Sequence, residues 1–442
     1  METQTPFLFL IPVLFSFYSS ITYSMAANTI AVNQTIRDGQ TIVSPQESFE
    51  LGFFSPTTAT RNRYLGIWYK RLATGTVAWV ANRETPIANE SGELTLRPDG
   101  VLVLRDSTTN TIVWSSLNPS TKTAQNPIAQ LLDSGNLMVV DRDREGGNDD
   151  PEDYIWQSFD HPGNTFLSGS KFGRNLEKGV VTNITSWKTE DDPSQGEYSV
   201  YMDFNGFPQI YLSKSDVIQM RLGSWNGLRY TGMPSLTPNS IFTFEQVSNE
   251  REIYYIFEPI NRSVTTKLML DSEGNMVRLN WNNRTQGWFE FSTPAIDNCV
   301  RYALCGPHGS CAIEQSPPCG CLKGFTPKNQ GEWDVSDWVS GCRREIPLDC
   351  GVGEGFRKYS SVKLPDTRNS WFDRNMTLDE CRVKCKNECN CSAYSTLDIK
   401  DDIGCLLWYD ELIDINSFRN NGQDIYIRMA AAELGTFSSC FF

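Results

Sequence analysis

This chain of 442 residues has few histidines, fewer basic than acidic residues and no cysteine before Cys299. Of its 2 His, His161 lies in a DHPGN stretch and His308 in a cysteine-rich one, with no catalytic setting around either. The 39 basic residues are outnumbered by 53 acidic ones, for a net charge of −14. Nucleic-acid binding calls for a basic stripe, so this balance argues against such a partner. We expect no catalysis by this chain.

Long apolar runs are also missing beyond the N-terminus. FLFLIPVLFSFY (7–18) has the length of a secretory signal core and is too short to span a bilayer comfortably, although METQT before it has no Lys or Arg. No later stretch approaches the roughly 20 apolar residues of a membrane helix. We therefore expect 1–27 to be a cleaved signal peptide. The rest is expected to be secreted to the apoplast or cell wall, or to be the outer part of a longer plasma-membrane receptor.

What the chain does contain is aromatic residues and short alternating apolar runs. Its 12 Trp, 24 Phe and 16 Tyr are ample for packed cores, and the length suggests three or four domains at about 150 residues each. A repeat ends at Trp79 (TVAWVAN), Trp114 (TIVWSS) and Trp156 (DYIWQSF). Three hairpin-bearing units with an inward Trp predict a pseudo-threefold β-prism sharing one core. DRDREGGNDDPED (141–153) is expected to be an exposed loop near a domain boundary, before a second β region.

QLLDSGNLMVV (130–140) resembles the sugar-binding strand Q-x-D-x-N-x-V-x-Y of monocot mannose-binding lectins. With Asn136 in the Asn position, the other four places hold Leu132, Ser134, Met138 and Val140. RPDGVLVLR (97–105) keeps Asp99, and DSEGNMVRL (271–279) keeps Asn275. Sugar binding needs several convergent donors and acceptors, which apolar side chains cannot supply. We expect Asp99, Asn136 and Asn275 to be vestiges of sugar sites on retained scaffolds.

The 13 cysteines are clustered, and 12 of them lie within 299–405. The first six follow C-x5-C-x5-C-x7-C-x-C-x20-C up to Cys342, and C-x-C-x-x-G-F (319–325) is typical of an EGF-like module, which disulfides stabilise. A zinc site is the alternative, but a C-x2-C pair is absent and His308 is the only His nearby. Asp297 and Asn298 are weak evidence for calcium, so neither a metal nor another cofactor is expected.

The stretch MTLDECRVKCKNECNCSAY begins with the capping box Thr377-x-x-Glu380, which predicts a helix. Leu378, Cys381 and Cys385 would share one face of that helix. The two cysteines could then clamp it onto strands that carry Cys391 and Cys405. The region from 350 to 430 looks like a PAN/apple domain.

Taken in order, these parts resemble the S-domain of plant S-locus glycoproteins and of S-domain (G-type lectin) receptor-like serine/threonine kinases. The resemblance rests on RDGQTIVSPQESFELGFFSP (37–56), YLGIWYKR (64–71), WVANRETPI (79–87), IWQSFDHPGNTFL (155–167), SWNGLRYTG (224–232), CGPHGSC (305–311), VKLPDT (362–367) and DIYIRMAAAELG (424–435). It implies a mainly β chain. The expected parts are a bulb-type lectin domain (28–153), a second lectin-like S-locus glycoprotein domain (154–295), an EGF-like module (296–343), a PAN/apple α+β domain (350–430) and a truncated tail (431–442).

The resemblance also implies a disulfide framework. The implied pairs are Cys299–Cys311, Cys305–Cys319, Cys321–Cys342, Cys381–Cys405 and Cys385–Cys391. Cys350 and Cys389 are left as a further pair, and Cys440 is the odd cysteine. Glycosylation is expected at the sequons of Asn33, Asn89, Asn183, Asn261, Asn283 and Asn375, whereas Asn390 is doubted because it lies between two cysteines.

The family implies extracellular recognition of a protein or peptide, in pollen recognition during self-incompatibility or in defence signalling. Expected partners are a cysteine-rich peptide or a receptor ectodomain, with possible homo- or heterodimers. Kinase motifs are not found in this chain. The alternatives are a carbohydrate-binding lectin and a partial product of a receptor kinase gene. Candidate contact residues are Tyr211, Trp225, Tyr230 and Phe242, for which the competing interpretation is a place in the core.

Overall fold

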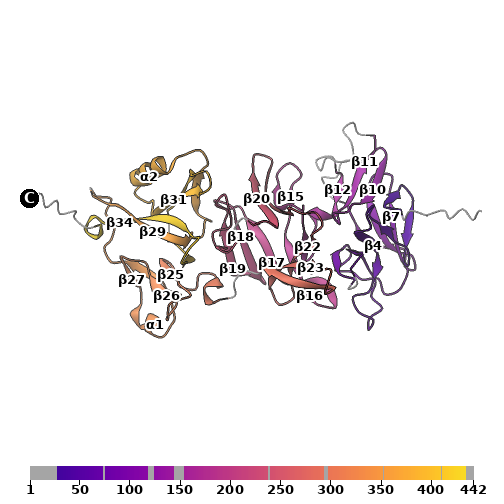
Figure 1. The fold of residues 1–442 in the computed structure, drawn as a ribbon, viewed down its shortest axis with the longest axis horizontal. Helices are drawn as coiled ribbons and strands as arrows, with labels where there is room; N and C mark the ends of the chain where they lie inside the picture. The colour runs from indigo at the N-terminus through magenta and orange to yellow at the C-terminus, as the bar shows by residue number, and fades with distance from the viewer. Residues whose placement is uncertain are drawn as a thin grey trace, which may run out of the picture.

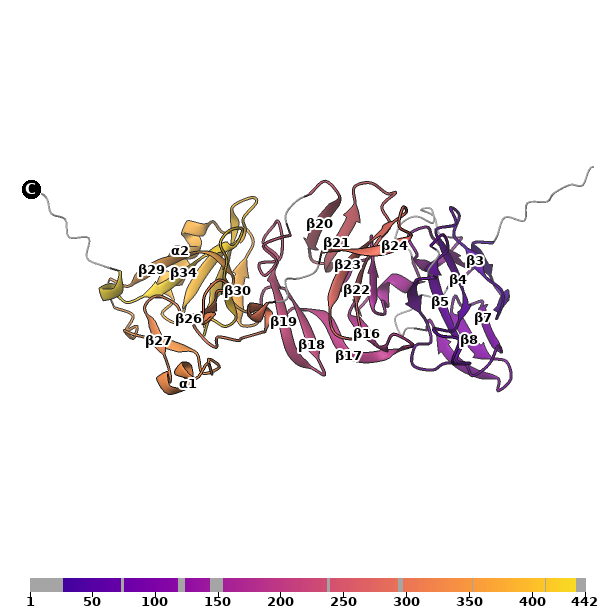
Figure 2. The ribbon, with the colours of Figure 1, turned by 60° about the horizontal axis from the view of Figure 1, so that its bottom comes forward.

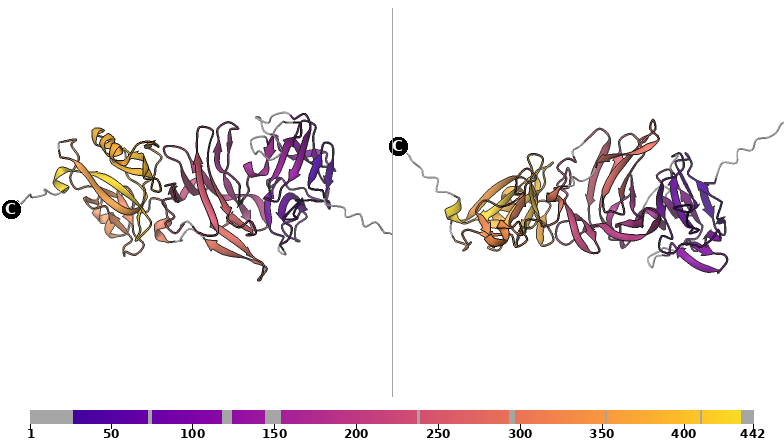
Figure 3. Two further views of the ribbon diagram at one scale, coloured as in Figure 1. Left: turned by 45° about the horizontal axis from the view of Figure 1, so that its top comes forward. Right: turned by 90° about the horizontal axis from the view of Figure 1, so that it is seen from below.

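A computed structural model describes residues 27–72, 75–117, 124–143, 154–236, 239–292, 297–351, 353–409 and 411–434. The expected signal peptide, most of the expected loop at 141–153 and Cys440 lie outside these ranges. The described residues form three bodies in a row (Figure 1), and the same order is seen from other sides (Figures 2 and 3). These bodies are a first β-prism, a second β-prism and a disulfide-rich C-terminal body.

The first prism consists of three four-stranded antiparallel sheets. The first sheet contains β3 (Ile42–Val43), β4 (Phe49–Phe54), β5 (Tyr64–Tyr69) and β6 (Val77–Val80). The second contains β2 (Thr35–Arg37), β7 (Gly92–Leu96), β8 (Leu102–Asp106) and β9 (Thr111–Ser115). The third contains β1 (Thr29–Ala31), β10 (Pro127–Leu131), β11 (Leu137–Asp141) and β12 (Trp156–Gln157). Each sheet turns one face inward, since side chains alternate along a strand.

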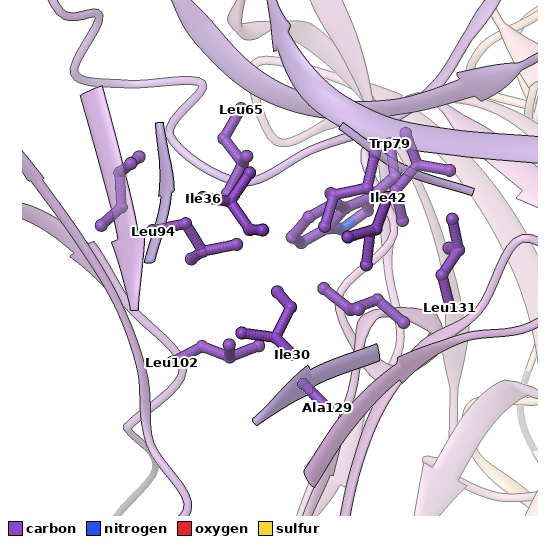
Figure 4. Close-up of a cluster of buried hydrophobic side chains, with 14 of the residues drawn as sticks. Ile30, Ile36, Ile42, Leu65, Trp79, Leu94, Leu102, Ala129 and Leu131 are labelled. Carbon is purple, nitrogen blue, oxygen red and sulfur yellow. The ribbon is translucent and has the colours of Figure 1, made fainter. Parts of the chain in front are cut away.

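The three inner faces share a single core. Side chains from all three sheets, among them Leu65, Leu94 and Leu131, converge on one centre (Figure 4). Each sheet also contributes one indole ring. The rings of Trp79, Trp114 and Trp156 meet edge to face, with centroids 5.7 to 6.0 Å apart. The prediction of a threefold prism with inward tryptophans is therefore confirmed.

The first prism extends beyond the boundary expected after residue 153. Trp156 of β12 pairs with Val139 of β11, so this strand completes the third sheet. The 3-10 turn η2 (Ser158–Asp160) follows, and the second prism begins only at β13 (Thr165–Leu167). The expected boundary is wrong because a short edge strand beyond the loop returns to the first core.

The second prism repeats the arrangement of three four-stranded sheets. One sheet joins β13 to β22 (Thr266–Leu270), β23 (Met276–Asn282) and β24 (Gly287–Ser292). Another joins β14 (Phe172–Asn175), β15 (Val180–Val181), β20 (Phe242–Ser248) and β21 (Glu252–Pro259). The last joins β16 (Ile184–Thr189), β17 (Asp192–Asp203), β18 (Gln209–Lys214) and β19 (Val217–Ser224). Its core is rich in Phe, Tyr and Met.

The C-terminal body is built on one eight-stranded sheet. Its strands are, in spatial order, β26 (Cys319–Cys321), β25 (Gly309–Cys311), β33 (Ile415–Ser417), β29 (Gly355–Lys363), β34 (Gln423–Met429), β31 (Ala393–Asp398), β32 (Ile403–Trp408) and β30 (Ser370–Asp373). The smaller elements are η3 (Asn298–Val300), β27 (Phe325–Pro327), α1 (Gln330–Asp334), β28 (Cys342–Arg344), α2 (Leu378–Asn387) and η4 (Ala431–Glu433). Because Ser310 of β25 pairs in parallel with Ile415 of β33, the two regions expected to be separate modules share this sheet.

The helix α2 is held as its sequence indicates. Thr377 Oγ1 accepts a hydrogen bond from the Glu380 backbone, and Glu380 Oε2 accepts one from the Thr377 backbone, so the capping box is formed. Cys381 and Cys385 are fully buried on the inner face. Among the described residues the structure contains six disulfides, joining Cys299–Cys311, Cys305–Cys319, Cys321–Cys342, Cys350–Cys389, Cys381–Cys405 and Cys385–Cys391. Five of these pairs are the ones that the family resemblance implied, and the sixth joins Cys350 and Cys389, the two cysteines left as a further pair.

A buried ionic cluster joins the second prism to the C-terminal body. Arg221 of β19 is 1% exposed, and its Nε lies 2.7 Å from Asp414 Oδ2. The same carboxylate oxygen lies 2.7 Å from Lys363 Nζ. Burial pulls the pKa of Arg221 down, but Asp414 raises it on balance. Burial lowers the pKa of Lys363 to about 8 even though Asp414 opposes the shift.

Removing the charge of Asp414 should loosen this joint. Asp414→Asn keeps the size of the side chain, and Asn tolerates the left-handed backbone at φ 64°, but Arg221 and Lys363 lose their shared counter-ion. We expect the free energy of unfolding of the C-terminal body to fall by about 3–5 kcal/mol in urea titrations. Glu314→Gln, which breaks an exposed pair with Arg419, is the control and should change it by less than about 1 kcal/mol. Equal effects of the two substitutions would contradict the role of the cluster.

Candidate functional site

The expected sugar-binding strand, β11, has an apolar outer face. Leu137 and Val139 point into the prism core, whereas Met138 and Val140 lie on the opposite face. These two outer side chains are only 1% and 2% exposed because they pack with Ile128 in a separate apolar cluster. Where the lectin pattern has Val and Tyr, this strand therefore has two buried apolar side chains that pack against each other and Ile128.

Asn136, the one residue of the pattern retained here, has a structural role. It is 4% exposed, and its Nδ2 donates to Gln157 Oε1 at 2.9 Å. Its Oδ1 accepts from Ser158 Oγ at 3.2 Å and from the Phe159 backbone at 3.3 Å. The side chain ties β11 to the segment that completes the sheet, so its hydrogen-bonding groups are already used.

The other two vestigial positions are also used within their own hairpins. Asp99 lies 2.6 Å from Arg97 in a surface ion pair. Asn275 donates from Nδ2 to Asp271 Oδ2 at 2.9 Å, and its backbone donates to Asp271 Oδ1. In all three hairpins the polar atoms close the turn or the sheet, and none of the hairpins presents the polar row of the lectin pattern.

Two grooves lie where the prisms face each other. One, here called the lysine groove, has a volume of about 480 Å³ and includes Phe54, Trp187, Glu190, Lys267, Asp271 and Glu273 in its lining. The other, here called the tryptophan groove, has a volume of about 450 Å³ and includes Trp79, Trp114, Trp156, Leu117, Val181 and Asn183 in its lining. Both volumes fall in the range of about 300–1,000 Å³ typical of ligand sites.

Arg83 holds the prisms in the arrangement that creates these grooves. Its Nε donates to the Pro193 carbonyl at 2.8 Å, and its Nη1 donates to Thr185 Oγ1 at 2.7 Å. Trp79 Nε1 donates to the His161 carbonyl at 2.9 Å, and Trp288 Nε1 donates to Thr76 Oγ1 at 2.9 Å. Directional bonds from both sides of the junction fix the groove walls.

Lys267 is the unusual residue of the lysine groove. It is 4% exposed, and its Nζ lies 5.1 Å from the centre of the Trp288 ring and 3.6 Å from Met269 Sδ. No carboxylate among the described residues forms an ion pair with it, and burial lowers its pKa to about 8. A buried ammonium without a counter-ion costs folding energy, and such perturbed groups concentrate at functional sites.

The lining of this groove combines apolar and acidic groups. Phe54 and Trp187 provide aromatic surface, and Glu190, Asp271 and Glu273 provide carboxylates. An acidic side chain of a ligand could pair with Lys267 while its basic neighbours meet the carboxylates. Sequence reasoning missed this site, and the only signal was a lysine beside the three apolar residues of the strand TKLML.

The four expected contact aromatics are core residues. Tyr211, Trp225, Tyr230 and Phe242 are 1%, 9%, 2% and 2% exposed. Trp225, Tyr230 and Phe242 pack in the core of the second prism, and Tyr211 donates its hydroxyl proton to Asp366 at 2.8 Å in the joint with the C-terminal body. The hypothesis that these residues are exposed anchors is wrong, because three of them turn into the core of the second prism and the C-terminal body covers Tyr211.

The expected glycosylation sites are exposed to solvent, and the cysteines of the described residues are paired in disulfides. Exposed positions are found for Asn33, Asn89, Asn183, Asn261, Asn283, Asn375 and also Asn390. In the described part of the chain, the one grouping of potential metal ligands is Cys305, Cys311 and Cys319, and each of these sulfurs is in a disulfide. This grouping does not fit a zinc ion, which needs free thiolates.

The match to known families follows the order of the bodies. A D-mannose binding lectin model matches residues 76–188, an S-locus glycoprotein domain model matches 220–329, and a PAN-like domain model matches 350–415. An S-locus-specific glycoprotein of Brassica oleracea is 37% identical over 93% of this chain and 93% of its own length. The chain belongs to the S-locus glycoprotein family.

Other members of this family are longer than the S-locus glycoproteins. A receptor-like serine/threonine-protein kinase of Arabidopsis thaliana is 39% identical over 93% of this chain, which spans only 48% of that relative. In the described residues no helix is long and apolar enough to cross a membrane.

Among solved structures, the mannose-specific agglutinin from snowdrop (Galanthus nivalis) is 19% identical, with a TM-score of 0.21 over 28% of this chain and 97% of that one. The two-domain Scilla campanulata agglutinin is 15% identical, with a TM-score of 0.20 over 61% of this chain and 88% of that one. These scores are too low to support an inference about the ligand of this S-locus glycoprotein relative.

His308 packs inside the C-terminal body, and we expect its titration to make the stability of the protein depend on pH. Its ring stacks on Phe325 at 4.9 Å, and its Nδ1 has no hydrogen-bond partner among the described residues. Burial, with help from Arg344, lowers its pKa to about 4. Between pH 4 and 6.5 the unfolded chain, in which the His pKa is about 6.5, therefore binds a proton that the folded protein does not bind.

Above pH 6.5 the titration of His308 should leave the free energy of unfolding unchanged. As the pH falls from 6.5 toward 4, this free energy should drop by about 3 kcal/mol. The variant His308→Asn cannot titrate, and Asn tolerates the positive φ of 56°. We expect its unfolding free energy to decline less steeply than that of the wild type over this window, as measured by urea titrations at each pH. Parallel pH profiles would contradict the assignment.

Proposed function

We propose that this chain is an extracellular recognition module whose ligand is a polypeptide, either a cysteine-rich peptide or a receptor ectodomain, and not a mannose-type glycan. The observation that carries the proposal is the outer face of β11. There Met138 and Val140 form a closed apolar contact, and the side chain of Asn136 is already hydrogen-bonded to Gln157 and Ser158. The six disulfides support an extracellular location, because such bonds persist in oxidising compartments.

The lysine groove is the proposed site of the polypeptide. Proteins bind through a few buried aromatic and charged groups, and this groove places Phe54 and Trp187 beside an unpaired Lys267. A carboxylate from the ligand would supply the missing counter-ion. Since Arg83 and the bonds across the junction fix the walls, the ligand would meet a preformed surface, which lowers the entropy cost of binding.

A glycan array tests the first half of the proposal. The secreted, folded protein should show no mannose-competed binding, because the polar residue that each hairpin retains is already bonded within the protein. A mannose-binding bulb lectin serves as the positive control. Binding that mannose displaces and that disappears in Asn275→Ala would contradict the proposal. Asn275 is preferred to Asn136 for this purpose, since Asn136 is buried and its removal would also disturb the sheet.

Binding to a panel of secreted cysteine-rich peptides and receptor ectodomains tests the second half. For any member that binds saturably, Lys267→Met should weaken the affinity by about tenfold or more, because it removes a charged hydrogen bond of about 1.5–3 kcal/mol. The control Lys188→Met changes a lysine that is 66% exposed and should alter the affinity less than about twofold. Equal affinities of wild type and Lys267→Met would place the site elsewhere.

Lys267→Met also has a useful stability readout. Because the buried ammonium lacks a counter-ion, its replacement by Met should leave the unfolding free energy unchanged or raise it. A loss of binding in a variant that is equally or more stable separates a role in recognition from a role in folding.

A further inference from the structure

The tryptophan groove carries exposed apolar side chains on both of its walls. Leu117, just beyond β9 of the first prism, is 66% exposed, and Val181, at the end of β15 of the second prism, is 54% exposed. Trp79, Trp114 and Trp156, whose indole rings pack edge to face, also line this groove. Apolar surface gathered in a concave site, with polar groups around it, marks a place where something binds.

Asn183 stands in the lining of the same groove. It belongs to the sequon Asn183-Ile184-Thr185, between β15 and β16, and it is exposed. None of the other five expected glycosylation sites is part of the lining of this groove. A sugar attached to Asn183 would therefore begin inside the groove, held there by a covalent bond.

Pyranose rings are suited to such a surface. The C–H face of N-acetylglucosamine is apolar and packs on aromatic and aliphatic side chains, while its hydroxyl and acetamide groups find polar partners at the edge. In this groove the polar partners are Asp160, His161 and Ser115. A volume of about 450 Å³ provides room for the first sugars of the chain.

We propose that Asn183 carries an N-linked glycan whose first sugars pack into the tryptophan groove and cover Leu117 and Val181. In the transfer, Asn183 Nδ2 loses one proton and bonds to the anomeric carbon of N-acetylglucosamine. The bond from that carbon to the diphosphate of a lipid-linked donor breaks, and the lipid diphosphate leaves with the bonding electrons and takes up the proton.

This glycan would bridge the two prisms. It grows from the second prism and rests on the tryptophans and Leu117 of the first, beside the bonds that Arg83 makes across the same junction. Packed between the prisms, the glycan would fix the angle between them and shield the apolar side chains of Leu117 and Val181 from water. The lysine groove, which is a separate groove in the same junction, remains open.

Native digestion by an endoglycosidase tests the inference on the wild-type protein. The full chain is secreted from cells that keep N-glycans in the high-mannose form, and glycopeptide mass spectrometry follows each site over time. The glycan on Asn89, an exposed sequon that is not part of this groove, is the internal control. We expect the Asn183 glycan to be cleaved at least about tenfold more slowly than the Asn89 glycan in the native protein, and at the same rate after denaturation, a difference of ~1.4 kcal/mol in protection.

Two outcomes would overturn the inference. An unmodified Asn183, or native cleavage at Asn183 as fast as at Asn89, shows that no glycan is packed in the groove. The double variant Leu117→Ser, Val181→Ser removes the apolar walls while leaving the sequon intact, and it should restore rapid cleavage at Asn183 without changing its occupancy. Continued protection in that variant would mean that the groove is not the cause.

Discussion

The contact between Arg221 and Asp414 is the interaction on which the placement of the C-terminal body against the second prism depends. It buries a guanidinium and a carboxylate at the joint between the second prism and the C-terminal body, with Lys363 on the same carboxylate oxygen. Buried charges are tolerated only with good geometry, so this cluster permits one arrangement and disfavours others. Asp366, which accepts hydrogen bonds from Tyr211 and Tyr302 close by, extends the same constraint.

The junction between the prisms follows a different rule. There Arg83, Trp79 and Trp288 donate directional hydrogen bonds, Leu167 of β13 joins the core of the first prism, and open grooves flank these contacts. Under the proposed function, recognition takes place in the space between the prisms and not on the polar face of a strand.

Much of the fold was predictable because the features that decide it are local. The hairpin turns and the capping box of α2 act within a few residues, and the repeat that ends at Trp79, Trp114 and Trp156 shows in the sequence as a recurring local pattern. The candidate site was less accessible to prediction. Tyr211, Trp225 and Tyr230 could have been surface anchors or core residues on the same pattern, and only the direction of each side chain distinguishes the two.

By itself, the sequence determined the prism repeat and the vestigial state of the strand at 130–140, since replacing Gln by Leu132 and Tyr by Val140 removes the chemistry in any fold. Only the tertiary structure decided that β12 belongs to the first prism, that the cysteine-rich module and the helical domain share a sheet, and that Lys267 and Asn183 line grooves between prisms. These features depend on contacts between residues far apart in the chain. Their burial and pairing follow from how the finished domains pack, which no local pattern records.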